Sequence, residues 1–211
     1  MVTATRTEVR SSHLRSFALD RTRIALVPDQ AVLLAGDHVE VSVRVGSGRT
    51  LQIVEPGGTV AYAMRGSSAR WDVTIEVEDG GSLVWEGQPF VVAEGADVSR
   101  RLAVNLAGSA RVTLRETLVL GRSGEQPGRL VSRTDVRRDD LPVLVEELDA
   151  SVGLGRHRVV DQVLCLGWEC AGEGLALESG DRLHRWLGAE THASPVSVRP
   201  SSLCQSSPRE E

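Results

Sequence analysis

The chain has 211 residues, of which 41% are hydrophobic, and it carries a formal net charge of −5 with a pI near 5.6. This length is enough to bury one sizeable core, and β-rich domains often reach it undivided, so we expect a single β domain over residues 1–190. The weak negative charge provides no general attraction to nucleic acid or to an anionic membrane, and neither is an expected partner.

The first twenty residues contain scattered arginine and glutamate but no apolar run of the length that a signal peptide needs. No later segment approaches the roughly 18 consecutive apolar residues of a membrane-spanning helix. Cys165, Cys170 and Cys204 form an odd set without C-x-x-C spacing, which favours reduced thiols over a disulfide framework or a compact zinc site. We therefore expect a cytoplasmic protein.

Residues 31–120 are dominated by alternation of apolar and polar side chains, which predicts strands with one buried face. The pattern is clearest in HVEVSVRV (38–45), and it returns in WDVTIEV and RLAVNL. A Gly- or Ser-containing turn and a second strand follow each of these segments, so three hairpin-like units result.

Aligning Val41 with Val73 and Leu102 gives spacings of 32 and 29 residues, which is close to a repeat. Each unit would leave an apolar face that only a stacked neighbour can cover. We therefore predict an all-β, mostly antiparallel fold of stacked or helically wound layers, with an immunoglobulin-like sandwich as the main competitor.

The C-terminal third predicts two strands around the turn at Asp139 and Asp140, and another strand within residues 157–170. In SGDRLHRWLGAE, apolar residues at helical spacing lie between a possible cap at Ser179 and a stop at Gly188. One or two short helices are expected toward this end. Residues 191–211 are rich in serine and proline, and we expect a disordered tail there.

Two glutamates fall on the apolar face of their strands. Glu116 shares its parity with the leucines of RVTLRETLVL, and Glu55 does the same in RTLQIVE, with Gly87 at the equivalent place of the middle unit. A buried carboxylate needs an arginine partner, a hydrogen-bond network or water. We weigh two interpretations, namely an internal salt bridge or strand end reaching solvent, and a hydrated passage in which oxygen ligands hold a divalent ion weakly.

Asp37 begins its strand after Gly36, where it is either a turn carboxylate or a further oxygen ligand. The five histidines show no short spacing that would predict a preformed metal site. A cupin-like, ligand-binding barrel would need two histidines and a glutamate in its first motif, where this chain supplies only His38. No nucleophile elbow or phosphate loop is present, so we expect no enzyme. A β-sandwich interaction module stays open as an alternative.

Five segments, in this order, resemble motifs of the urease accessory protein UreD family. They are AGDHVEVSVRVGSG, GGTVAYAMR, GGSLVWEGQPFVV, RETLVLGRSGE and RTDVRRDDLPVLVEELD, within roughly residues 31 to 165. The chain departs from the family pattern at Val60, Gln88 and Arg115, where the family has Lys, Glu and Trp.

The resemblance implies a β-rich scaffold with a water-filled passage that guides nickel. Such proteins bind a UreF-like helical accessory protein and, through it, a UreG-like GTPase, and they dock on the urease apoprotein. The resemblance implies transient Ni²⁺ but no tightly bound cofactor, no fixed metal site and no catalytic residue. Glu116, Glu55 and Asp37 are then the candidate transit residues.

Overall fold

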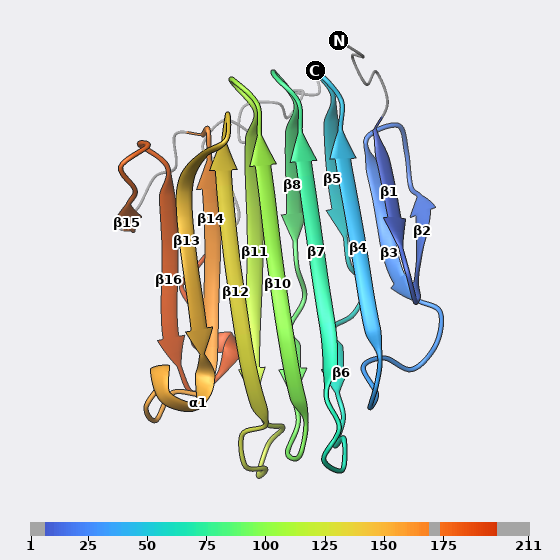
Figure 1. The fold of residues 1–211 in the computed structure, drawn as a ribbon, viewed down its shortest axis with the longest axis vertical. Helices are drawn as coiled ribbons and strands as arrows, with labels where there is room; N and C mark the ends of the chain where they lie inside the picture. The colour runs from blue at the N-terminus through green and yellow to red at the C-terminus, as the bar shows by residue number, and fades with distance from the viewer. Residues whose placement is uncertain (1–6, 169–173, 198–211) are drawn as a thin grey trace, which may run out of the picture.

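The computed structural model describes residues 7–168 and 174–197, which form two β-sheets packed face to face (Figure 1). The sheet nearer the viewer in Figure 1, called sheet A here, has six strands. In spatial order these are β1 (Glu8–Ser11), β4 (His38–Val45), β7 (Ala69–Val77), β10 (Asp97–Leu106), β12 (Arg129–Arg138) and β13 (Leu141–Asp149).

Sheet B lies behind sheet A, and eight of its strands follow one path. In spatial order these are β15 (Leu175–Ala176), β16 (Arg182–Gly188), β14 (Val159–Leu166), β11 (Arg111–Leu120), β8 (Ser82–Glu86), β5 (Thr50–Val54), β3 (Arg23–Pro28) and β2 (Leu14–Ala18). Two short strands beside this path, β6 (Thr59–Ala61) and β9 (Phe90–Val92), pair with each other, and β9 also pairs with β11.

The chain winds through both sheets in three similar coils between residues 38 and 120. Each coil has a long strand in sheet A, a connection of four residues (46–49, 78–81 or 107–110) and a strand in sheet B. Strands of successive coils pair in parallel, with Val41 opposite Val73 and Val73 opposite Leu102. The repeat alignment predicted from the sequence is therefore confirmed.

The four-residue turns are bonded to one another from coil to coil. The Asp79 carboxylate accepts a hydrogen bond from the Ser109 backbone N–H at 2.8 Å, and the Gly48 N–H donates to the Asp79 carbonyl at 3.2 Å. These bonds satisfy backbone donors that the sheets do not reach. The turns thus hold the coils in register at one end.

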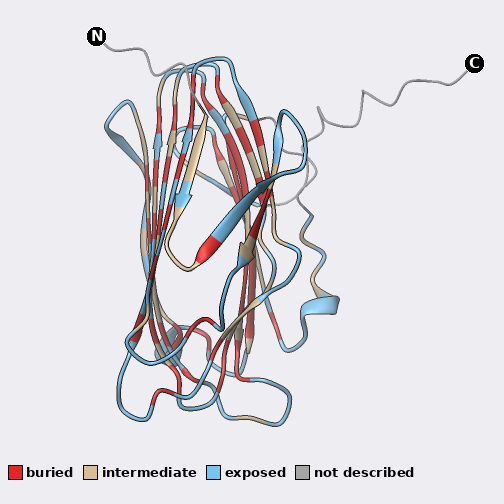
Figure 2. Cartoon of the chain, turned by 90° about the vertical axis from the view of Figure 1, so that its right-hand side faces the viewer, coloured by how far each residue is buried: buried red, intermediate tan, exposed pale blue. Residues whose placement is uncertain are grey.

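The core lies between the sheets, where the inward side chains of both layers meet. β4 alternates between exposed and buried positions along its whole length, and its four valines are at most 2% exposed. Figure 2 shows buried positions recurring along both layers. Burying each such side chain contributes about 1.5–3 kcal/mol, which makes this apolar face the main source of stability.

The predicted all-β fold of wound layers is confirmed, with one change in how the strands pair. Antiparallel pairing occurs toward the ends of the sheets, as in the β12–β13 hairpin around Asp139 and Asp140. The central coils stack in parallel instead, because the two strands of each coil lie in different sheets and are not hairpins. Alternation shows which face of a strand is buried but not which strand lies alongside it.

The helix expected between Ser179 and Gly188 is wrong, since residues 182–188 form strand β16. β16 pairs antiparallel with β14, which places Leu183 opposite Leu164, and a free strand edge thereby outweighs the local helical spacing. Ser179 donates to the Asp181 carboxylate at 2.8 Å and caps no helix. Within the described ranges, the short helices are α1 (Ala150–Gly153) and the 3₁₀ turn Thr191–Ala193.

The predicted tail falls mostly on residues 198–211, which lie outside the described residues. Within 191–197, Val196 packs against Val163 and Cys165 on the outer face of sheet B. Cys165 is disulfide-bonded, so the expectation of a reduced thiol is wrong at this position. In the described parts of the chain, no helix is both long and apolar enough to cross a membrane.

Candidate functional site

The two inward glutamates lie at equivalent places of the first and third coils, as predicted. Val54 pairs with Glu86 and Glu86 with Arg115 on three adjacent parallel strands. Glu55, Gly87 and Glu116 each follow one of these residues, so the middle coil contributes no side chain between the two carboxylates. A Cβ at Gly87 would lie 2.6 Å from the Arg115 carbonyl oxygen, which explains the glycine.

A cavity of about 40 Å³ lies beside these residues, between the two sheets. Its lining includes both carboxylates and the Arg100 guanidinium from the opposite sheet. Three aromatic side chains also line the cavity, namely Trp71, Trp85 and Phe90. A volume of roughly 10–15 Å³ suffices for one water molecule, so the cavity has room for water or a small ion.

Glu116 meets its partners inside the core. One carboxylate oxygen accepts a hydrogen bond from Arg100 Nη2 at 2.9 Å, and the other accepts one from Gln162 Nε2 at 3.1 Å. The side chains of Glu116 and Arg100 are each only 10% exposed. The internal salt bridge, one of the two interpretations of the sequence, is therefore present at Glu116.

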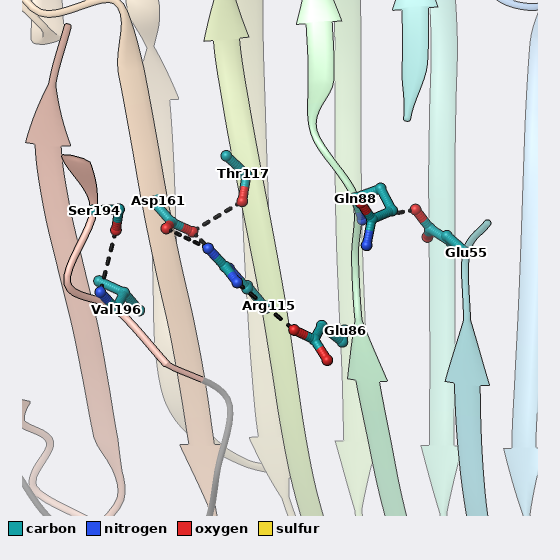
Figure 3. A network of polar contacts seen from close by, with 8 residues as sticks. All are labelled: Glu55, Glu86, Gln88, Arg115, Thr117, Asp161, Ser194 and Val196. Atoms are coloured by element: carbon teal, nitrogen blue, oxygen red, sulfur yellow. Dashed lines mark hydrogen bonds and ion pairs between the residues drawn. The ribbon is translucent and has the colours of Figure 1, made fainter. Parts of the chain in front are cut away.

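Among the residues that the structure describes, no arginine is bonded to Glu55. Its carboxylate accepts hydrogen bonds from Trp85 Nε1 at 2.7 Å and from the Gln88 backbone N–H at 3.0 Å, the latter drawn in Figure 3. Burial raises the pKa of Glu55, and the nearby Glu116 charge adds to this, while the two hydrogen bonds and Arg100 oppose it. A buried carboxyl group with a raised pKa is a candidate for proton or cation exchange.

Arg100 is not among the residues predicted from the sequence, although the alternation of its strand indicates an inward side chain. It shares its parity with Val98 and Leu102 on β10, whose side chains are buried, so an inward arginine could have been read in the same way as Glu116. Its guanidinium carbon lies 4.7 Å from the centroid of the Phe90 ring. Nε and Nη1 are buried and have no hydrogen-bond partner in the described structure.

A polar chain continues from Glu116 across the core to the edge of sheet A. Gln162 Oε1 accepts from Arg185 Nε at 2.8 Å, and Arg185 Nη1 donates to Glu146 on β13 at 2.6 Å. Arg185 and Glu146 are 25% and 29% exposed, so the chain reaches partial solvent there. No pattern in the sequence predicted this series of hydrogen bonds, because it depends on which strands of the two sheets face one another.

A second cluster lies on the outer face of sheet B, where Asp161 is fully buried (Figure 3). Arg115 binds Asp161 with both Nε at 3.0 Å and Nη2 at 2.8 Å, and Thr117 Oγ1 donates to the same carboxylate at 2.9 Å. Glu86 lies 3.7 Å from the Arg115 guanidinium. Every carboxylate oxygen of Asp161 is satisfied, which marks this cluster as a structural pin between β11 and β14.

Asp37 does not join the two glutamates. Its carboxylate accepts a hydrogen bond from the Leu34 backbone N–H at 2.7 Å, and it is not among the residues that line the cavity. The turn interpretation thus describes its position. His38 lies on the exposed face of β4 and is paired with Asp72 at 2.8 Å.

The arrangement offers hard oxygen ligands around a small space but no complete metal site. Among the described residues, no group of three or more histidine, cysteine, aspartate or glutamate side chains could hold an ion. Divalent nickel accepts carboxylate and water oxygens, and two carboxylates alone would bind it weakly. The cavity can therefore offer weak oxygen contacts to a divalent ion.

The family model and the curated relatives that match this chain all carry the same description. A family model described as UreD urease accessory protein matches residues 15–199. The chain is 48% identical over 156 residues to urease accessory protein UreD 1 of Streptomyces griseus, an alignment that covers 70% of this chain and 61% of the relative.

Two further relatives are more distant. Urease accessory protein UreD of Streptomyces coelicolor is 37% identical over 153 residues, covering 67% of this chain and 60% of the relative. Urease accessory protein UreD 2 of Saccharopolyspora erythraea is 34% identical over 156 residues, covering 68% and 54%. The matches thus span between about half and three fifths of the length of these curated relatives.

Proposed function

The chain belongs to the UreD family of urease accessory proteins, and from this premise we propose that it guides nickel toward the active site of apo-urease. The observation that carries the proposal is the cavity between the sheets, which is lined by Glu55 and Glu116 from equivalent positions of the first and third coils. A core that is otherwise apolar tolerates such carboxylates only at a cost. If the two carboxylates line a passage for a hydrated cation, their burial in the core has a functional reason.

The proposed work is binding and positioning, without catalysis. The chain acts in the cytoplasm as a scaffold that binds a UreF-like helical protein, reaches a UreG-like GTPase through it, and docks on the urease apoprotein. Glu55 and Glu116 supply oxygen contacts to nickel in transit, and water fills the remaining coordination positions. Asp37, which is bonded to its own turn, lies away from this cavity and at most contributes at an entrance.

Complementation of urease-positive cells that lack their own UreD tests the passage. We expect the wild-type chain to restore urease activity and nickel content, and Glu116→Ala to restore much less of both while remaining soluble. Glu40→Ala on the exposed face of β4 is the matched control and should behave as wild type. Full activation by Glu116→Ala would remove that residue from the proposal.

A pull-down with purified partners tests the scaffold separately. The chain should retain a UreF-like protein, should retain a UreG-like GTPase only when the UreF-like protein is present, and should retain apo-urease in the assembled complex. If the chain retains none of these three partners, the scaffold role is contradicted, independently of the role of the cavity.

A further inference from the structure

Arg100 is held less firmly than Arg115 and Arg185, which also bind carboxylate or amide oxygens of the two sheets. Arg115 grips Asp161 with two nitrogens, and Arg185 uses all three guanidinium nitrogens on Gln162 and Glu146. Arg100 makes one hydrogen bond in the described structure, from Nη2 to Glu116. It is nevertheless the most buried of the three, with 10% of its side chain exposed against 24% and 25%.

The two unused nitrogens of Arg100 face an unfavourable environment. Nε and Nη1 are buried without a partner among the described residues, and a buried donor left unsatisfied is costly. Arg100 also lines the cavity that contains Glu55 and Glu116. The guanidinium is therefore a charged group beside a mainly apolar cavity, and most of its hydrogen-bond donors have no acceptor among the described residues.

The charges in the cavity explain why a cation and Arg100 compete. Arg100 neutralises Glu116, the carboxylate to which it is bonded, and it also attracts Glu55 electrostatically. A divalent cation that binds Glu116 would meet the positive guanidinium at 2.9 Å from the same carboxylate. Like charges at such distances repel strongly inside a protein, so both cannot occupy Glu116 together.

We propose that Arg100 is a mobile internal counter-ion that masks Glu116, so that a divalent cation enters the cavity only by displacing its guanidinium. The displaced guanidinium stays over the Phe90 ring, where cation–π attraction holds it, and turns its free nitrogens away from the ion. This inference rests on the proposed function and names its regulation. Arg100 neutralises Glu116 while no ion is bound and limits how long an ion stays.

Nickel titration of tag-free protein, by calorimetry and by quenching of tryptophan fluorescence, tests the mask. Trp85 donates to Glu55, so an ion in the cavity lies near a natural reporter. We expect Arg100→Met to bind Ni²⁺ roughly ten- to a hundredfold more tightly than wild type, the factor that corresponds to losing one charged hydrogen bond. Arg100→Lys keeps the positive charge and should bind no more tightly than wild type.

The double variant Arg100→Met/Glu116→Gln removes both the mask and the masked group, and it should lose the gain in affinity. Equal affinity of Arg100→Met and wild type, in protein whose thermal melt shows it folded, would overturn the proposal. So would a double variant that keeps the gain. If Arg100→Met does not fold, Arg100→Gln replaces it in the same titration, and an unchanged affinity there also overturns the proposal.

Urease activation in cells separates this inference from the proposed function. Tighter binding by Arg100→Met together with normal activation by Glu55→Gln and Glu116→Gln would support the mask but contradict the nickel passage. Loss of activation in the glutamate variants with unchanged affinity in Arg100→Met would support the passage and contradict the mask.

Discussion

Glu55 gives the protein a pH dependence whose sign follows from burial. Its folded-state pKa is raised above the unfolded value of 4.5, mainly by desolvation. The folded state then holds the proton more tightly, so the stability from this group is fully present below pH 4.5 and is lost as the pH rises through the raised pKa. Glu55→Gln should therefore gain stability relative to wild type as the pH increases from 4.5 to 8.

Urea unfolding at several pH values measures this difference. The exposed Glu40→Gln variant is the control and should show no comparable trend. If the stability difference between Glu55→Gln and wild type stays constant or shrinks as the pH rises, burial does not govern the pKa of this carboxyl group.

The ion pair between Arg115 and Asp161 predicts that truncating Arg115 lowers the free energy of unfolding strongly. Arg115→Met leaves the fully buried Asp161 carboxylate with Thr117 as its remaining side-chain partner among the described residues. Removing one member of a buried ion pair costs about 3–5 kcal/mol. We expect the lower end, because a quarter of the Arg115 side chain is exposed. Arg44→Met, which breaks the exposed pair with Glu76, should change the free energy of unfolding little.

At the level of elements, Gly87 marks a close approach between the second and third coils. The added methyl group of Gly87→Ala would collide with the Arg115 carbonyl, and overpacking of this kind costs about 1–3 kcal/mol. Gly57→Ala meets no atom within 4 Å and should be neutral or slightly stabilising. Denaturant unfolding of the two variants compares them, and equal stabilities would contradict the close approach.

The sequence predicted the faces of strands better than their neighbours. Parity alone placed Val41, Glu55 and Glu116 inward, because one face of each strand must be buried. It could not reveal that β4 pairs in parallel with β7, since alternation is the same for both kinds of sheet. The apolar spacing between Ser179 and Gly188 favours a helix, because a local window of sequence does not contain the edge of β14 with which residues 182–188 pair.

The candidate site was predicted only in part for a related reason. Glu55 and Glu116 lie on one sheet, so their equivalence could be read from the repeat. Arg100 lies on the opposite sheet, and its contact with Glu116 depends on how the two layers align across the core. Turn geometry sets that alignment, and no residue pattern within a single strand encodes it.

For the whole molecule, stacking predicts a gradient of local stability. β7 and β10 each pair with strands on both sides, whereas β1, β2 and β15 have one neighbour each in the described structure. Amide hydrogen exchange followed by mass spectrometry should therefore be slowest in β7 and β10 and fastest in the edge strands. Uniform protection across both sheets would indicate that the coils open only together.

The four-residue turns also decide where the molecule accepts foreign sequence. An epitope or dye-labelling segment spliced between Gly48 and Arg49 would break the bonds that these residues donate to Asp79 and Gly46. The opposite end of the same coil has an exposed loop at Gly66 and Ser67, where the Ser67 N–H donates to Met64 of the same loop and not, among the described bonds, to another coil. A reporter grafted there should leave the bonds between the stacked turns, and with them the winding of the coils, intact.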